Sequence, residues 1–193
     1  MRVICSACAL VVCAGPAVQA QTKDRGPYAG YELMEMAMNR FQYFAGEFGY
    51  AFDDRYRLSL SIMEVNLTER HLSSGWESSA IDGDGVAGYL RSYELHLKRR
   101  MWRGLYLSGG VGYARDRYVH EASGMELVSQ TPTLGVGFGW RWQEPLSIPH
   151  LYIDLAVPVR YYFNRIEETA LGDATVRPHV VVNNIWLFIG AQW

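Results

Sequence analysis

Several charged side chains are spaced so that they could meet inside the folded protein. Glu94, His96 and Lys98 alternate with apolar residues along one stretch of the chain. Because successive side chains of a β-strand point to opposite faces, this spacing separates the polar side chains from the apolar ones. The alternation puts further charged residues on the polar faces of other stretches, namely Glu47, Arg57, Arg141, Asp154 and Arg160. Buried groups of both signs predict a hydrogen-bonded interior ladder, and an acid–base pair at Glu94 and His96 is the catalytic alternative.

Other residue types that could do chemistry are poorly arranged for it. The segment His120-Glu121-Ala122-Ser123 holds the residue types of a hydrolytic triad, but sequence neighbours do not match triad geometry and no nucleophile elbow is present. We interpret them as solvated loop residues. The histidines have no metal-like spacing, and they are His71, His96, His120, His150 and His179. We therefore predict no metal site and no cofactor.

One stretch, Leu134 to Trp142, shows the alternation in its clearest form. Its odd-numbered positions hold Gly135, Gly137, Gly139 and one arginine, whereas its even-numbered positions are all bulky and apolar. The empty face is expected to leave room for large polar side chains of the following stretch, which are Tyr152, Asp154, Arg160 and Tyr162. Such a strand suits a small closed barrel whose outside meets lipid.

Two prolines flank this stretch in the expected barrel. Proline lacks the N–H that a strand donates to its neighbour, so a proline inside a closed ladder opens a local gap. Pairing around the turn near Leu146 would set Pro158 opposite about Leu134, close to Pro132. This seam is predicted as a lateral opening, and simple bending of the strands is the alternative.

Eight stretches of alternating hydrophobicity follow one another along the chain. They span about residues 28–38, 41–52, 55–65, 86–99, 104–119, 126–142, 150–163 and 179–193. Connections after the second, fourth and sixth are short, whereas those after the third, fifth and seventh are longer and polar. Membrane barrels have such alternating short turns and long loops. The predicted fold class is all-β, an eight-stranded antiparallel up-and-down transmembrane β-barrel.

The first twenty residues have the composition of a secretory signal peptide. Arg2 supplies the positive start, Val3 to Val12 the apolar region, and Val18-Gln19-Ala20 a small-residue cleavage site. The expected domains are therefore a signal peptide at 1–20 and a barrel at 21–193. All three cysteines lie in the signal, so the exported chain would have neither disulfides nor thiolate ligands.

The charge and composition of the chain limit the classes of partner that it is expected to bind. The chain carries 18 basic and 20 acidic residues, which argues against a nucleic-acid partner. Arginines gather near the expected outer rim, where guanidinium groups could bind the phosphates of lipopolysaccharide. They are Arg40, Arg70, Arg115, Arg117, Arg165 and Arg177. Outer-membrane lipid and lipopolysaccharide are the expected partners of a monomer.

The eight amphipathic stretches, the cysteine-free body and the ending Leu187-Phe188-Ile189-Gly190-Ala191-Gln192-Trp193 resemble the OmpA-type and OmpX-type barrels of Gram-negative bacteria. The resemblance covers the chain after the signal. It implies a location in the bacterial outer membrane and a C-terminal signal, here Trp193, read by the outer-membrane assembly machinery. It also implies a non-enzymatic role in envelope integrity or in surface interactions through the loops.

Two alternatives from other functional classes stay open. The prolines are similar to the proline-interrupted seams of the lipid A palmitoyltransferase barrel, but this chain lacks that enzyme's N-terminal helix and the room for its catalytic residues. A secreted lipocalin-like carrier would alternate similarly, with its apolar face inward. Tryptophan and tyrosine near the strand ends favour the membrane barrel.

Overall fold

The computed structural model describes residues 25–38, 43–67, 81–82, 85–163, 168–176, 181–183 and 185–193. The expected signal peptide at 1–20 lies outside these described residues. Within them, no helix is long and apolar enough to span a membrane.

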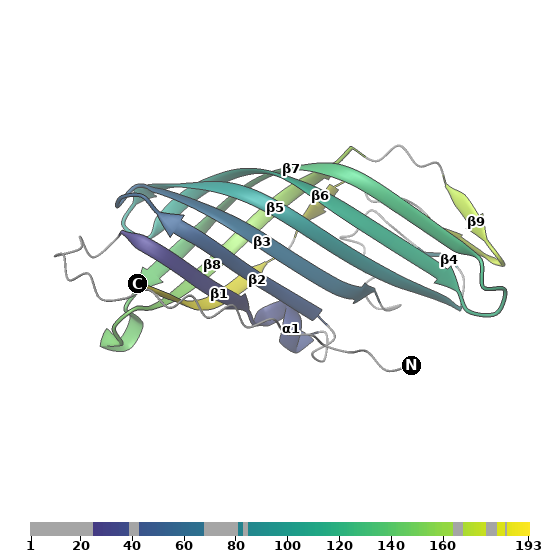
Figure 1. Ribbon diagram of the computed structural model, residues 1–193, viewed down its shortest axis with the longest axis horizontal. Helices are drawn as coiled ribbons and strands as arrows, with labels where there is room; N and C mark the ends of the chain where they lie inside the picture. Colours follow the sequence, from purple (N-terminus) through teal and green to yellow (C-terminus); the bar gives the residue numbers. More distant parts are fainter. Residues whose placement is uncertain are drawn as a thin grey trace.

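Antiparallel strands close into a barrel (Figure 1). In chain order the wall consists of β1 (Gly26–Glu32), β2 (Tyr43–Ala51), β3 (Tyr56–Leu67), β5 (Val86–Trp102), β6 (Leu105–His120), β7 (Glu126–Gln143), β8 (Leu151–Tyr162), β11 (Val181–Asn183) and β12 (Trp186–Gln192). β11 and β12 pair with successive parts of β8 and together fill the eighth position. β12 also pairs with β1, which closes the ring. The predicted eight-stranded up-and-down barrel is confirmed.

The two ends of the barrel differ. The short connections and the C-terminus lie at one end, on the left of Figure 1, which we call the short-turn end. There Asp53 Oδ1 accepts the N–H groups of Arg55 and Tyr56 at 2.7 Å each, which tightens the turn and lowers the pKa of Asp53. A short 3-10 turn, η1 (Pro145–Ser147), connects β7 to β8 at the same end. The opposite end we call the long-loop end.

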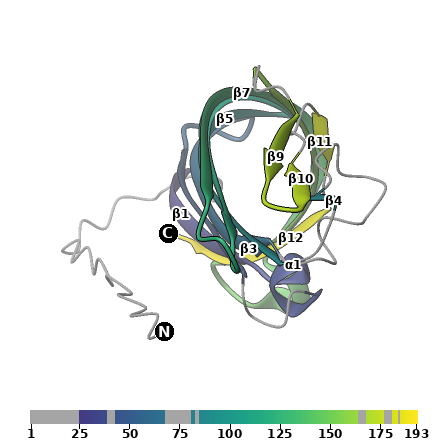
Figure 2. The same cartoon turned by 90° about the vertical axis from the view of Figure 1, so that its right-hand side faces the viewer.

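A small sheet at the long-loop end was not predicted. β4 (Ile81–Asp82) and β9 (Thr169–Leu171) both pair with β10 (Ala174–Val176), so two loops far apart in sequence are joined. Figure 2, seen from the long-loop end, shows β9 and β10 in front of the barrel interior. Leu171 and Val176 are buried in the same apolar cluster as Tyr118 of β6. This hairpin therefore packs into the mouth of the barrel.

The first strand is shorter than predicted. It ends at Glu32, and the chain continues as α1 (Met34–Met38) instead of running as a strand to residue 38. The Glu32 carboxylate is fully buried and accepts the N–H groups of Met34 at 2.8 Å, Met36 at 3.3 Å and Leu187 at 3.0 Å. A buried carboxylate needs such donors, and a helical turn supplies two of them. The predicted strand over 28–38 is wrong beyond Glu32 for this reason.

The wall has an apolar outer face and a polar inner face. Val136 and Phe48 are 61% and 53% exposed, whereas Glu47 and Asp154 are 0% exposed. This distribution is the reverse of that in an ordinary soluble protein, in which charged residues are almost never fully buried. The strand period alone dictates it, since each inward residue is followed by an outward one.

Glycines on the inner face accommodate tyrosine rings. A Cβ at Gly139 would meet the ring and hydroxyl of Tyr106. Tyr152 lies instead against Gly190, its partner in the β8–β12 pairing, and against Gly30 of β1. The expectation that Tyr152 fills the space over the β7 glycines is therefore wrong, because Tyr106 of the neighbouring β6 occupies it.

Gly139→Ala should lower the free energy of unfolding by about 1–3 kcal/mol, since the added methyl group collides with Tyr106 and with the Leu155 carbonyl oxygen at 2.6 Å. Gly109→Ala is the matched control, because nothing lies within 4 Å of a Cβ built there. Urea-induced unfolding in lipid vesicles measures both. Equal losses for the two variants would contradict the packing described here.

Candidate functional site

The centre of the barrel holds a cluster of opposite charges. Lys98 of β5 places its Nζ 2.7 Å from Glu47 Oε2 of β2 and 3.3 Å from Asp154 Oδ2 of β8. All three side chains are buried. A single ammonium group therefore joins strands on opposite sides of the interior.

Tyrosines and one arginine complete this cluster. Tyr106 donates its hydroxyl to Asp154 Oδ1 at 2.5 Å, and Tyr152 donates to Glu47 Oε1 at 2.9 Å. The Arg141 guanidinium stacks 3.5 Å from the Tyr152 ring centre, and its Nη1 lies 3.9 Å from Glu47 and 3.8 Å from Asp154. Each carboxylate thus has a tyrosine donor and two cations around it, which offsets the cost of burying it.

A second cluster lies nearer the long-loop end. Arg160 Nε is 2.6 Å from Glu94 Oε1, and His96 Nε2 is 3.0 Å from Glu94 Oε2. The guanidinium of Arg160 also lies 4.2 Å above the Trp186 ring. Both oxygens of Glu94 are engaged, so Glu94 and His96 form part of a packed ion network.

The structure brings all eight predicted interior residues inside the barrel. Arg57, the remaining one, is buried on β3 and pairs in register with Lys98. An eight-stranded barrel is only wide enough for its side chains to fill the interior. Cross-linked ion pairs and stacked rings in that space form a rigid polar plug.

Sequence reasoning missed the interior acid Asp116 and did not assign Tyr106 and Tyr152 to the polar network. Asp116 of β6 is 2% exposed, and its Oδ1 has no hydrogen-bond partner among the described residues. Its position between the exposed Arg115 and Arg117 was the available signal, since alternation puts it inside. Tyr106 and Tyr152 carried the same signal.

The proline positions differ from the expected register. Pro158 lies opposite Gly137, and Leu134 lies opposite Tyr161. Directly opposite residues share a face, and Pro158 points inward whereas Leu134 points outward, so the expected pair was wrong. Pairing between β7 and β8 runs without a break from Thr133 to Gln143.

On the other side of β8, the described pairing with β12 extends to Ala156 and the described pairing with β11 begins at Val159, and residue 184 between β11 and β12 lies outside the described residues. Pro132 pairs with Tyr113 of β6, and its carbonyl accepts the Phe163 N–H at 3.1 Å. The pairing of the described residues therefore shows no gap between β7 and β8.

Two of the six rim arginines can be placed. Arg115 and Arg117 point outward from β6 near the long-loop end, and Arg117 makes a two-point ion pair with Glu126 of 2.8 and 2.9 Å. The other four lie outside the described residues, and they are Arg40, Arg70, Arg165 and Arg177. Trp193 is exposed at the short-turn end, where its N–H donates to the Pro27 carbonyl at 3.0 Å.

His120 sits at the centre of a Ser–His–Asp contact chain. Its Nδ1 lies 2.8 Å from Ser123 Oγ, and its Nε2 lies 2.6 Å from Asp173 Oδ1 in the β9–β10 turn. Nδ1 also accepts the Ser123 N–H at 3.2 Å, so the ring proton is on Nε2 and donates to Asp173. This hydrogen bond lowers the pKa of Asp173. Sequence reasoning could not find Asp173, because it comes from a distant loop.

The geometry of this chain of contacts fits a latch between loops. The Met125 N–H donates to Ser123 Oγ at 3.3 Å, and the Gly124 N–H donates to the His120 carbonyl at 2.8 Å. Amides that could stabilise an oxyanion are therefore committed to the turn. We call His120, Ser123 and Asp173 the loop latch. Within the described ranges, no group of three or more His, Cys, Asp or Glu side chains could hold a metal ion.

Comparison with known proteins gives likenesses in fold. No family model matches the chain, and no curated protein matches it. Similar solved structures include the N-terminal β-barrel domain of Pseudomonas aeruginosa OprF, at 14% identity over 90% of this chain and 100% of that chain with a TM-score of 0.45. Ail, the attachment invasion locus protein of Yersinia pestis, is 12% identical over 88% of this chain and 97% of that chain, with a TM-score of 0.44.

Neisserial surface protein A (NspA) is 11% identical over 88% of this chain and 95% of that chain, with a TM-score of 0.40. The expected eight-stranded barrel is found in the strand ladder of this chain itself. At these identities, the closed barrel of this chain is established by its own strand pairing.

Lys98→Met should lower the free energy of unfolding by about 3–5 kcal/mol, because it leaves Glu47 and Asp154 buried with only Arg141 nearby. Adding Glu47→Gln should restore part of the loss, which a double-mutant cycle in urea would measure as a coupling of about 0.5–3 kcal/mol. Arg99→Met, on the exposed outer face, should change stability by no more than about 0.5 kcal/mol. Strictly additive losses would mean that Lys98 and Glu47 do not act together.

Asp173→Ala should speed hydrogen exchange in the β9–β10 hairpin, because it removes the contact of His120 with that hairpin. Ser123→Ala is the control, since Ser123 contacts only its own turn. The lowered pKa of Asp173 means that its contribution is present at neutral pH and is lost only as the pH falls below 3.8 through the folded-state value. Mass spectrometry of exchanged peptides measures these effects, and unchanged exchange in Asp173→Ala would disprove the latch.

Proposed function

We propose that this protein is a non-enzymatic barrel of the bacterial outer membrane that crosses the membrane with its eight strands and whose filled interior conducts no ions. The observation that carries the proposal is the reversed burial of the wall, with apolar side chains outside and paired charges inside. Lipid is the solvent in which such an outer face is favourable.

The outer face supports this proposal in detail. Apolar side chains are exposed all around the wall, and they include Phe48, Leu60, Leu95, Leu107, Val136, Phe138, Leu155 and Ile189. Exposed aromatic residues lie toward both ends, with Trp102, Trp142 and Trp193 at the short-turn end and Tyr113, Tyr161 and Phe163 toward the long-loop end. Two such girdles are typical of membrane barrels. A lipocalin-like carrier would require the opposite orientation of the faces, so this arrangement favours the membrane barrel.

The proposed orientation puts the short-turn end in the periplasm and the long-loop end at the cell surface, as in outer-membrane barrels generally. Arg115 and Arg117 would then lie beyond the upper girdle, at the height of lipopolysaccharide phosphates. Trp193 would be available at the periplasmic rim to the assembly machinery. The loops, held by the loop latch and by the β4–β10–β9 sheet, would supply envelope stabilisation or surface contacts by a monomer.

The polar plug inside the barrel predicts negligible ion conductance across a bilayer. Purified protein in planar bilayers should give no stable single-channel steps, whereas a large porin in the same bilayer gives them. The folded barrel should also migrate differently on gels before and after heating, because the closed strand ladder resists detergent until heated. Large stable steps from heat-modifiable protein would overturn the filled interior, and recovery of the protein outside the membrane fraction would overturn the location.

A hydrolase acting on outer-membrane lipid is the second candidate function. One observation favours it, the contact chain from Ser123 through His120 to Asp173. The test compares lipid A, by mass spectrometry, from cells that carry the wild-type protein, the Ser123→Ala variant or no protein. The comparison decides between the non-enzymatic barrel and the hydrolase. A change in lipid A that needs Ser123 would favour the enzyme, and identical profiles would leave the structural role.

A further inference from the structure

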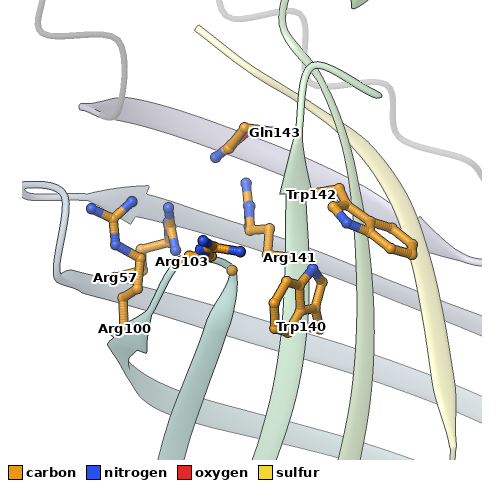
Figure 3. Close-up of a pocket in the computed structure, with 8 residues that line it drawn as sticks. Arg57, Arg100, Arg103, Trp140, Arg141, Trp142 and Gln143 are labelled. Atoms are coloured by element: carbon orange, nitrogen blue, oxygen red, sulfur yellow. The ribbon is translucent and has the colours of Figure 1, made fainter. Parts of the chain in front are cut away.

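A pocket of about 320 Å³ opens at the short-turn end of the barrel (Figure 3). Its walls come from β3, from the turn between β5 and β6, and from the end of β7. The lining residues are Arg57, Arg100, Arg103, Gly104, Trp140, Arg141, Trp142 and Gln143. We call it the short-turn arginine pocket. Its volume falls at the lower end of the range of about 300–1,000 Å³ that is usual for small-molecule sites.

The charge of this pocket is strongly positive. Four of the eight lining residues are arginines, and no described lining residue is acidic. Arg100 pairs with the Asp54 carboxylate at 2.8 Å, on the outer edge of the turn. Deeper in the barrel, Glu47 and Asp154 are shared between Arg141 and Lys98. Among the lining residues themselves, all the charge is therefore carried by guanidinium groups.

Hydrogen-bond donors in this region lack acceptors. Trp140 Nε1 and Arg141 Nε and Nη1 are buried and make no hydrogen bond to any described residue. The Arg141 Nη2 group donates to Gln192 Oε1 at 3.0 Å, and Nη1 lies at the longer distances of 3.9 and 3.8 Å from Glu47 and Asp154. Buried donors are nearly always satisfied in folded proteins, so a group of them beside one cavity points to an acceptor-rich ligand.

The turn that carries Arg103 is shaped to hold this side chain near the pocket. Arg103 has a φ of 47°, in the left-handed region that non-glycine residues rarely adopt, and its guanidinium lies 4.7 Å from the Trp102 ring centre. Gly104 follows, and a Cβ there would collide with the Arg141 carbonyl oxygen at 2.5 Å. The missing side chain lets the turn pack directly on β7. Such backbone geometry persists where surrounding contacts hold it in place.

We propose that the short-turn arginine pocket binds one phosphate-class oxyanion. Guanidinium groups bind phosphate with two parallel hydrogen bonds, and several of them around one cavity match its three or four oxygens. Arg103 and Arg141 contribute donors and Arg57 and Arg100 contribute charge. The phosphate belongs either to a soluble compound or to the headgroup of an anionic phospholipid, since the lining joins the barrel interior to the membrane-facing Trp142.

The test uses the full-length exported chain, folded in a neutral detergent and titrated with inorganic phosphate by calorimetry. We expect saturable binding that weakens as sodium chloride is added, because salt screens the attraction between charges near the surface. Arg103→Gln should weaken binding about tenfold, as is usual for losing one charge-assisted hydrogen bond. Arg99→Gln is the matched control, with the same charge change four residues away on the outer face, and should leave binding within about twofold.

A second arm separates the two sources of phosphate. The same protein is placed in nanodiscs of phosphatidylcholine with or without phosphatidylglycerol, and phosphate binding is measured again. Competition by phosphatidylglycerol, relieved by Arg103→Gln, assigns the site to a lipid headgroup, whereas unchanged binding assigns it to a soluble phosphate. Heat-modifiable migration of each variant shows that it has folded.

The proposal is overturned if folded wild-type protein binds neither inorganic phosphate nor phosphatidylglycerol, or if Arg99→Gln and Arg103→Gln weaken binding equally. The detergent arm depends only on the pocket and not on the cellular location of the protein. Its failure is therefore distinguishable from a failure of the proposed membrane role, which fractionation and conductance measure.

Discussion

The pairing of buried charges inside a closed wall is the constraint on which the rest of this structure depends. Because the outer face is apolar, the interior receives the polar side chains, including the fully buried carboxylates of Glu47 and Asp154. Buried charges are destabilising unless paired and hydrogen-bonded. Lys98 and Arg141 supply the opposite charges, and Tyr106 and Tyr152 supply the neutral donors.

The pairing of buried charges also explains where glycines and tyrosine rings lie on the inner face of the wall. Glycines such as Gly139 and Gly190 lie under tyrosine rings, so the rings can reach the carboxylates across the interior. At the short-turn end, the ladder gives way to the four arginines that line the short-turn arginine pocket.

Much of the wall could be predicted from the sequence, because alternation has a period of two and identifies the face of each residue without knowledge of its neighbours. The interior positions of Glu94, His96 and Lys98 follow from this period alone. Register does not follow from it, since it depends on how many residues each turn takes up. The turn from Gln143 to Tyr152 moved Pro158 opposite Gly137 instead of Leu134.

The structure of the long-loop end was the part of the fold that the sequence predicted least well. Strands of two or three residues, such as β4 and β10, carry no measurable period, and their partners are about ninety positions apart in the chain. The hydrogen bond between His120 and Asp173 fastens the β9–β10 hairpin to the β6–β7 turn. Loops joined in this way cannot diverge independently. In the proposed orientation, with the long-loop end at the cell surface, an antibody or phage that selects changes in one loop would drive compensating changes in the other, so the two loops would evolve as one unit.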